Sequence, residues 1–192
     1  MSLTKIIICG VGGQGIILSS KILSEVALES GYDVKQSEVH GMAQRGGSVI
    51  SHIIYGEKVY SPIISENEAD ILLGFEKLET ARYINFLKKD GFVICNDLKL
   101  KPVNIQKYPD EEINQLLNKK NILFINALKY CEELGSTKVM NIFLLGVLSN
   151  YLNLADDNYI KLIEKNVKEE FRKININAFI YGRKVGIKND ME

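Results

Sequence analysis

The run Lys5-Ile6-Ile7-Ile8-Cys9-Gly10-Val11-Gly12-Gly13-Gln14-Gly15 decides how the N-terminal part of this chain folds. Its first half is a short β-branched stretch that ends at glycine, which is typical of a buried strand in a parallel sheet. Its second half is a glycine loop, and the residues after it have the spacing of a helix that runs to about Glu29. Residues 32–39 should form the next strand. This strand–loop–helix–strand order predicts the opening of a doubly wound α/β sheet.

Residues 48–61 carry a different strand signal. Residues 48–55 alternate between two faces, and Gly56-Glu57 then leads directly into Lys58-Val59-Tyr60-Ser61. Two strands joined by so short a polar turn predict a β-hairpin. A hairpin inside a strand–helix–strand series implies a mixed sheet, which a pure Rossmann domain would not have at this point.

The rest of the chain returns to alternating elements and then becomes helical. Strands are predicted at 70–75, 91–95 and 121–126, and helices at 77–88, 110–119, 128–133 and 137–151. Asp156 and Asp157 can cap a long helix to about Ile174, and the charged tail from Arg183 onward should fray. We therefore expect residues 1–192 to form one α/β domain, a three-layer, Rossmann-like mixed sheet with an inserted β-hairpin and a helical C-terminal part.

Composition and charge exclude several classes of protein. The chain has 24 basic and 24 acidic residues, and no stretch departs far from neutrality, so nothing in it indicates a nucleic-acid partner. With 46% hydrophobic residues and only 3 prolines, the chain has the composition of a folded protein rather than a disordered one. The most apolar helix candidate, residues 139–152, is too short to span a bilayer, so no membrane association is expected.

The cysteines indicate a cytoplasmic protein without a metal site of its own. Cys9, Cys95 and Cys131 are far apart in the sequence and odd in number. They form no C-x-x-C pair, and they do not supply the usual four thiolates of an iron–sulfur cluster. Buried, reduced thiols are the favoured interpretation. The N-terminal residues also lack the layout of a signal peptide.

The glycine loop Gly10–Gly15 satisfies G-x-G-x-x-G between a strand and a helix. Glycines at these positions let the backbone approach an anionic group, whose charge the helix N-terminus favours. A bound dinucleotide would also need an acidic residue about 20 positions further on. Lys35 occupies that offset, with Asp33 and Glu38 on either side, of which Glu38 is better placed. We therefore favour a phosphate-binding or interface role for the loop over bound NAD or FAD; a tight turn that only serves packing is the structural alternative.

The stretch Glu38-Val39-His40-Gly41-Met42-Ala43-Gln44-Arg45-Gly46-Gly47-Ser48 is the most unusual in the chain, because it has three glycines around one arginine. Glycine neighbours would let the guanidinium reach a carboxylate or a phosphate with little steric hindrance. The composition favours anion recognition, or insertion of the loop into a partner, no more than it favours a simple connection between strands.

Together, the two glycine motifs resemble the small, gamma-type subunit of the 2-oxoacid:ferredoxin oxidoreductases, and within that family the indolepyruvate type. The block from Glu38 to Val49 carries most of the resemblance. Further along, Met140-Asn141-Ile142-Phe143-Leu144-Leu145-Gly146 is similar to the Asn-Met-x-x-Leu-Gly helix of these subunits. The resemblance extends over nearly the whole chain.

The resemblance implies a subunit of an enzyme that oxidatively decarboxylates aryl-pyruvates to acyl-CoA and passes the electrons to ferredoxin. This chain lacks a Gly-Asp-Gly thiamine motif and a cysteine cluster. Thiamine diphosphate and the iron–sulfur clusters would therefore belong to a larger partner subunit, with CoA as a further component of the complex. The isolated chain should bind none of these alone and should be inactive.

Within that complex, the glycine-rich loops should complete or cover the partner's active site. Arg45 is the one candidate for a catalytic role, since it could meet a substrate carboxylate or a CoA phosphate. His40 and Gln44 would assist by hydrogen bonding, although a loop histidine without a chemical role remains the favoured alternative for His40, and His52 is expected to be structural. The interface and anion-binding candidates are Gly10, Gly12, Gly13, Gln14, Gly15, His40, Gly41, Gln44, Arg45, Gly46, Gly47 and Ser48.

Two other functions remain open from the residues alone. The first is a free-standing oxidoreductase that binds NAD or FAD at the glycine loop. The second is a non-enzymatic nucleotide- or anion-binding module, which would be a stable monomer, whereas a subunit should present an apolar surface that needs covering.

Overall fold

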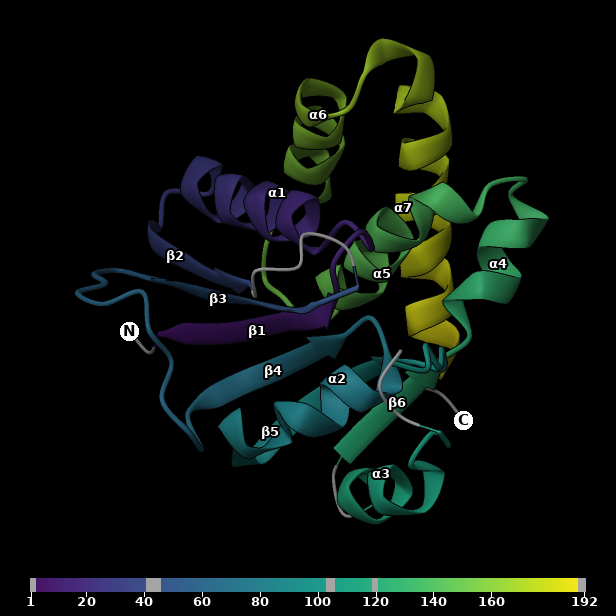
Figure 1. The fold of residues 1–192 in the computed structure, drawn as a ribbon. Coiled ribbons are helices and arrows are strands. Elements are labelled where there is room, and N and C mark those ends of the chain that lie inside the picture. The colour runs from purple at the N-terminus through teal and green to yellow at the C-terminus, as the bar shows by residue number, and fades with distance from the viewer. Residues whose placement is uncertain (1–2, 41–45, 103–105, 119–120, 190–192) are drawn as a thin grey trace.

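A computed structural model describes residues 3–40, 46–102, 106–118 and 121–189. Its centre is a six-stranded sheet with the order β2-β3-β1-β4-β5-β6 (Figure 1). The strands are β1 (Thr4–Val11), β2 (Asp33–His40), β3 (Ser48–Gly56), β4 (Ala69–Gly74), β5 (Leu87–Asn96) and β6 (Asn121–Ile125). The strands β1, β4, β5 and β6 are parallel to one another, which confirms the α/β expectation.

The strand β3 makes the sheet mixed. It lies antiparallel between β1 and β2, with Ile53 opposite Ile6 on one side and opposite Gln36 on the other. The mixed sheet with an antiparallel hairpin is therefore confirmed, but the hairpin is formed by β2 and β3, and the pairing predicted between residues 48–55 and 58–61 is wrong. Both edges of β3 are already paired, so no edge is left for residues 58–61. That segment instead runs as an irregular connection, held where the Val59 N–H donates to Asp33 Oδ2 at 2.9 Å.

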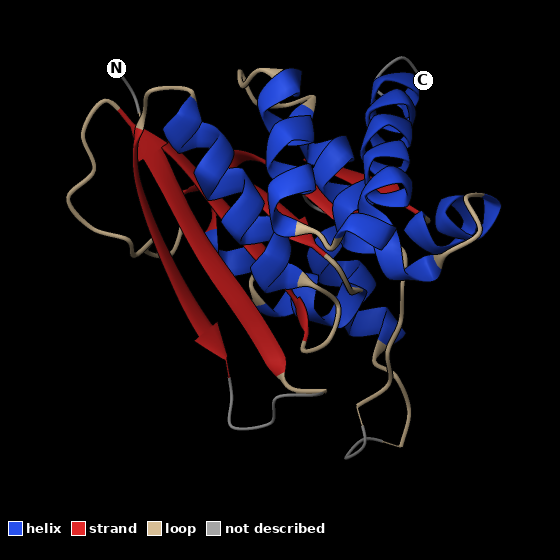
Figure 2. Cartoon of the chain, turned by 90° about the horizontal axis from the view of Figure 1, so that it is seen from above, coloured by secondary structure: helices blue, strands red, loops and turns tan. Residues whose placement is uncertain are grey.

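Helices cover both faces of the sheet, in the three layers that the sequence predicts (Figures 1 and 2). One face packs against α1, α4, α5, α6 and α7, and the other against α2 and α3. The helices are α1 (Ile16–Glu29), α2 (Lys77–Arg82), α3 (Asp110–Leu117), α4 (Ala127–Glu133), α5 (Met140–Ser149), α6 (Asp156–Asn166) and α7 (Glu169–Asn189), with short 3₁₀ turns η1 (Ile84–Phe86) and η2 (Thr137–Val139).

The alternation of side chains along β1 divides the core between these two layers. Ile6 and Ile8 point into the cluster under α1 and α5, whereas Ile7 and Cys9 point into the cluster under α2. All four are fully buried. Because both faces of the strand are covered, it reads as a continuous apolar run rather than as an alternating one.

The helix predicted at 77–88 is shorter in the structure. It ends at Arg82, and after η1 the strand β5 already begins at Leu87. Leu87 pairs with Ala69 of β4, and the Lys88 ammonium lies 2.7 Å from an Asp70 carboxylate oxygen on the same strand. Pairing with β4 therefore extends β5 over residues whose local sequence alone favours a helix.

The helix predicted at 156–174 is in fact two helices. The chain turns at Val167, which is extended, so α6 packs on α1 while α7 packs on α5. Asp156 does not cap α6 with its side chain but pairs with Arg183. The tail predicted to fray continues instead as α7 to Asn189, because α7 lies along the buried helix α5.

Contact between α5 and α7 is unusually close. A Cβ atom added to Gly146 would lie 2.2 Å from the carbonyl oxygen of Phe179, and one added to Gly182 would lie 2.0 Å from that of Phe143. Each helix therefore presents a glycine to the backbone of the other. A helix that is apolar on nearly all sides can lie either in a core or in a subunit interface, and this packing shows that α5 is buried within the chain.

Protonation of His52 is expected to weaken the fold. This buried side chain accepts a hydrogen bond from the Ile64 N–H at Nδ1, over 3.2 Å, and burial lowers its pKa. The unfolded chain therefore binds a proton more readily, so the free energy of unfolding falls as the pH drops below about 6.5. Losing one such bond costs about 1 kcal/mol, or about 2–4 °C in melting temperature for a chain of this size.

Melting curves between pH 8 and pH 5 check this prediction against His52→Asn, whose amide oxygen can accept the same bond without titrating. The melting temperature of the wild-type protein should fall more steeply than that of the variant. Parallel curves for the two proteins would contradict the role assigned to His52.

Candidate functional site

The two glycine motifs meet at the carboxyl end of β1. The Gly12 N–H donates to the Gly47 carbonyl at 2.7 Å, and the Gly46 N–H donates to the Gly12 carbonyl at 3.3 Å. Gly13 and Gly46 are exposed and have φ angles of +101° and +79°, a region that favours glycine. We call Gly12, Gly13, Gly46 and Gly47 the glycine edge.

Gln14 supports the glycine edge from inside. Its Oε1 accepts from the Val11 N–H at 2.7 Å, and its Nε2 donates to the Phe75 carbonyl at 3.2 Å. Gly10 leaves the space for this side chain, since an added Cβ would lie 2.6 Å from Gln14 Oε1. Among the predicted contact residues, Gln14 and Gly10 thus fix the loop to the end of β4.

Gly15 and Asn141 connect the glycine loop to α5. The Asn141 amide nitrogen donates to the Gly15 carbonyl at 3.4 Å, and an added Cβ at Gly15 would lie 2.7 Å from that nitrogen. The Asn141 carbonyl in turn accepts from Ser19 Oγ at 3.2 Å. Asn141, from the motif at residues 140–146, therefore positions the start of α1.

Ser48, the first residue of β3, contacts a buried carboxylate. Its Oγ donates to Glu79 Oε2, and the Tyr83 hydroxyl lies 2.9 Å from the same Oγ. The Glu79 side chain is buried on α2, and its Oε1 accepts from Arg82 Nε at 3.2 Å. Sequence reasoning missed Glu79, because no motif marks it and only the fold brings α2 to the start of β3.

A groove of about 450 Å³ lies beside the glycine loop, between the starts of α1 and α5 and the corner that joins α6 to α7. Lys138 and Lys168 line its polar part, and the N-terminal end of α1 at Gly15 adds a partial positive charge. Leu18 and the half-exposed Phe171 line its apolar part. The groove combines positive charge with apolar surface, which suits an anionic molecule with an apolar portion.

The structure brings together most, but not all, of the predicted site residues. Of these, Gly10, Gly12, Gly13, Gln14, Gly15, Gly46, Gly47 and Ser48 lie around the end of β1. Gly41, Gln44 and Arg45 fall outside the described residues, as does the side chain of His40. Arg45 directly precedes Gly46 in the sequence.

The position predicted for a dinucleotide ribose is already occupied by internal contacts. Glu38 Oε1 accepts from Gln36 Nε2 at 2.7 Å and from Ser20 Oγ at 3.2 Å. Moreover, β3 separates β1 from β2, so the end of β2 does not adjoin the glycine loop as it does in a Rossmann fold. This geometry disfavours NAD or FAD at the loop.

The three thiols are free and buried, as the sequence predicts. Burial raises the pKa of Cys95 and of Cys131 to about 12, and that of Cys9 well above its usual value, so all three thiols stay protonated at neutral pH. Within the part of the chain that the structure describes, no group of three or more His, Cys, Asp or Glu residues is placed to hold a metal ion.

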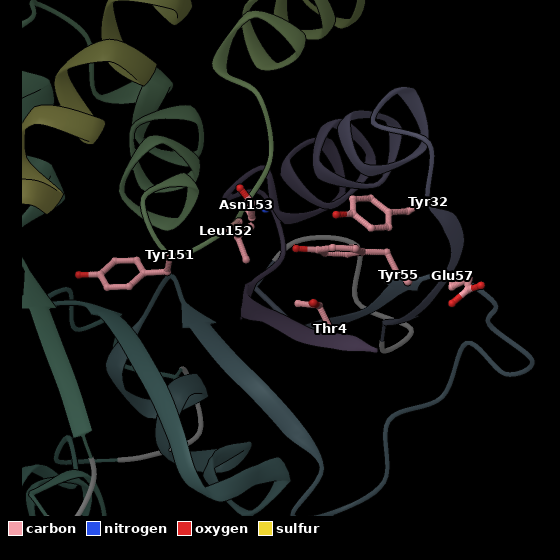
Figure 3. A pocket seen from close by; sticks show the side chains of 8 residues that line it. Thr4, Tyr32, Tyr55, Glu57, Tyr151, Leu152 and Asn153 are labelled. Atoms are coloured by element: carbon pink, nitrogen blue, oxygen red, sulfur yellow. The ribbon is translucent and has the colours of Figure 1, made fainter. Parts of the chain in front are cut away.

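A second cavity lies at the other end of β1. It measures about 500 Å³, and its lining includes Thr4, Tyr32 and Tyr55. The rings of the two tyrosines lie next to each other (Figure 3). The Tyr32 and Tyr55 ring centroids are 5.2 Å apart. None of the predicted site residues contributes to it, so the cavity is separate from the glycine edge.

The mixed strand order and the joined glycine motifs distinguish this chain from a dinucleotide-binding Rossmann domain. A family model for pyruvate ferredoxin/flavodoxin oxidoreductases matches residues 5–185, and the chain belongs to this family. Within the family, it is a gamma-type subunit of a 2-oxoacid:ferredoxin oxidoreductase, and therefore part of a multi-subunit complex. The resemblance seen in the glycine motifs is thereby confirmed.

Individual relatives agree in length and fold. The indolepyruvate oxidoreductase subunit IorB of Pyrococcus horikoshii is 37% identical over 190 residues, which cover 94% of each chain. The crystal structure of the keto/oxoacid ferredoxin oxidoreductase gamma subunit of Geobacter sulfurreducens matches 96% of this chain and 99% of its own, with a TM-score of 0.74 and 26% identity.

The same fold also occurs inside a longer chain. The 2-oxoglutarate:ferredoxin oxidoreductase of Magnetococcus marinus, solved with 2-oxoglutarate, coenzyme A and succinyl-CoA, matches 98% of this chain with a TM-score of 0.78 and 17% identity. This chain corresponds to 32% of that chain.

Among the residues that the structure describes, no helix has both the length and the apolar character needed to cross a bilayer.

Proposed function

We propose that this chain completes the active site of a larger catalytic subunit that oxidatively decarboxylates an aryl-pyruvate, indolepyruvate in particular, to the acyl-CoA and reduces ferredoxin. The observation that carries the proposal is the joining of the two glycine motifs by backbone hydrogen bonds at Gly12. That contact presents exposed glycine backbone at the carboxyl end of β1, and Arg45 is the residue before Gly46 in the sequence. The choice of indolepyruvate as substrate is based on the relatives that are named as subunits of indolepyruvate oxidoreductase.

The redox cofactors would belong to the partner subunit. In such an enzyme thiamine diphosphate supplies the decarboxylation chemistry, and iron–sulfur clusters carry the electrons. The three cysteines of this chain do not fit an iron–sulfur cluster, because Cys131 lies in a different core cluster from Cys9 and Cys95. Among the described residues, no group of three or more His, Cys, Asp or Glu side chains is placed to hold a metal ion.

The groove beside the glycine loop is the part of this chain best suited to CoA. Lys138 and Lys168 would attract its phosphates, and Leu18 and Phe171 would contact its apolar arm. Because the groove borders the glycine edge through Gly13, a bound CoA would lie next to the surface that meets the partner subunit.

Reconstitution tests the proposed function. The chain and a large catalytic subunit of the same family from the same organism, produced separately and mixed under anaerobic conditions, should form a complex that reduces ferredoxin with indolepyruvate and CoA. We expect neither subunit alone to turn over at more than about 1% of the rate of the complex, because oriented groups at such interfaces contribute about 10²-fold or more. Full activity of the large subunit alone would contradict the proposal.

A further inference from the structure

A buried carboxylate stands directly behind the glycine edge. Glu79 is only 4% exposed, and both its oxygens are used, one by Ser48 Oγ and the other by Arg82 Nε. A buried charge is costly unless it is paired, and packed apolar side chains often stabilise a core equally well. Packing alone therefore does not account for a carboxylate at this position.

The contacts of Ser48 show what the carboxylate holds. Ser48 follows Gly47, whose carbonyl accepts the 2.7 Å hydrogen bond from Gly12. Ser48 is also the residue at which β3 begins, and it pairs with Val11 at the end of β1. A hydrogen bond that fixes Ser48 thus fixes the point at which both glycine motifs are joined. The Tyr83 hydroxyl, 2.9 Å from Ser48 Oγ, closes the cluster.

We propose that Glu79 is a positioning residue for the reaction of the complex. Through Ser48 it holds the glycine edge in the orientation in which that edge meets the catalytic subunit. This inference rests on the proposed function. It assigns a role to Glu79 on α2, which lies outside both glycine motifs.

The chain offers a control next to the start of the same helix. Glu76, the residue before α2, is a second buried carboxylate, and its Oε1 accepts from the Tyr108 hydroxyl at 2.5 Å and from the Leu100 N–H at 3.0 Å. This carboxylate holds the segment that follows β5, and its Oε2 caps α2 by accepting from the Glu79 N–H at 2.9 Å. Tyr108→Phe therefore removes a hydroxyl–carboxylate bond like that of Ser48, together with the bond that the Tyr108 hydroxyl accepts from the Leu78 N–H, and leaves the bond between Ser48 and Glu79 in place.

The experiment compares reconstituted complexes that contain Ser48→Ala, Ser48→Thr, Glu79→Gln or Tyr108→Phe. Co-elution, melting temperature, kcat and KM are measured for each. Ser48→Ala and Glu79→Gln should assemble normally but lower kcat about tenfold, the effect of losing one hydrogen bond to a charged group. Ser48→Thr keeps the hydroxyl and should restore kcat to within about threefold, and Tyr108→Phe should stay within about twofold at a similar melting temperature.

A double variant adds a readout that general destabilisation would not produce. If Glu79 acts through Ser48, the Ser48→Ala/Glu79→Gln complex should be no slower than the slower single variant.

Three outcomes would overturn the positioning role. They are a wild-type kcat for Ser48→Ala, equal losses of kcat for Ser48→Ala and Tyr108→Phe, and fully multiplicative effects in the double variant. If omission of the whole chain leaves turnover unchanged, the proposed function fails together with this inference. If omission abolishes turnover while Ser48→Ala does not affect it, only the positioning role fails.

Discussion

Replacing Arg45 with alanine is expected to lower kcat of the reconstituted complex by about 100-fold, since a charged hydrogen-bond partner of a substrate anion contributes about 2–4 kcal/mol in a closed site. Arg45 is the residue before Gly46 in the sequence, and the exposed glycines Gly13 and Gly46 leave room at the glycine edge for a bound carboxylate or phosphate. Steady-state ferredoxin reduction with indolepyruvate and CoA measures the effect.

Two further variants test whether the effect depends on the guanidinium group and on its position in the chain. Arg45→Lys keeps the charge but loses the planar fork, so it should recover only part of the activity. Arg172→Ala removes an exposed arginine on α7, whose Nε donates to the Val167 carbonyl at 3.3 Å, and should leave kcat within about twofold. The role of Arg45 is refuted by unchanged kcat and KM in the alanine variant.

Replacing Gly146 with valine is expected to destabilise the chain by more than about 3 kcal/mol, and thus to prevent accumulation of folded protein. The new Cβ would lie 2.2 Å from the Phe179 carbonyl oxygen. That neighbour is the backbone of α7, which can move only if the helix separates from α5. The Gly146 of the C-terminal motif is therefore explained by helix packing and not by ligand contact.

Urea unfolding, followed by circular dichroism, checks the Gly146 prediction. Gly135→Ala is the control, because Gly135 has a φ of +85° but no atom within 4 Å of an added Cβ. Backbone strain alone should cost it about 1 kcal/mol. A Gly146→Val protein as stable as the Gly135→Ala control would show that α5 and α7 separate more easily than their contact indicates.

Local signals were sufficient where neighbouring residues dominate the outcome. The β-branched run 6–8 gave a buried strand, and the glycines that follow gave a tight loop into a helix, both as predicted. The alternation of 48–55 likewise predicted a strand, and in the structure both of its faces are buried. These predictions succeed because propensity and periodicity act over a few residues.

The candidate site also has a part that the sequence predicted and a part that only the fold shows. The sequence singled out the residues of both glycine motifs, and the fold confirms that the described ones gather at one end of β1. It gave no indication that Gln14 turns inward or that Ser48 contacts Glu79, since each contact joins segments separated by more than 30 residues.

By itself, the sequence thus determined the class of fold, the family and the two glycine motifs of the candidate site. The tertiary structure alone decided which strand pairs with β3, where the helix predicted at 156–174 breaks, and which side chains support the glycine edge. Strand partners depend on which edges remain unpaired, and a helix ends where its next stretch packs better against another element. Both are properties of the assembled chain, so no short stretch of sequence encodes them.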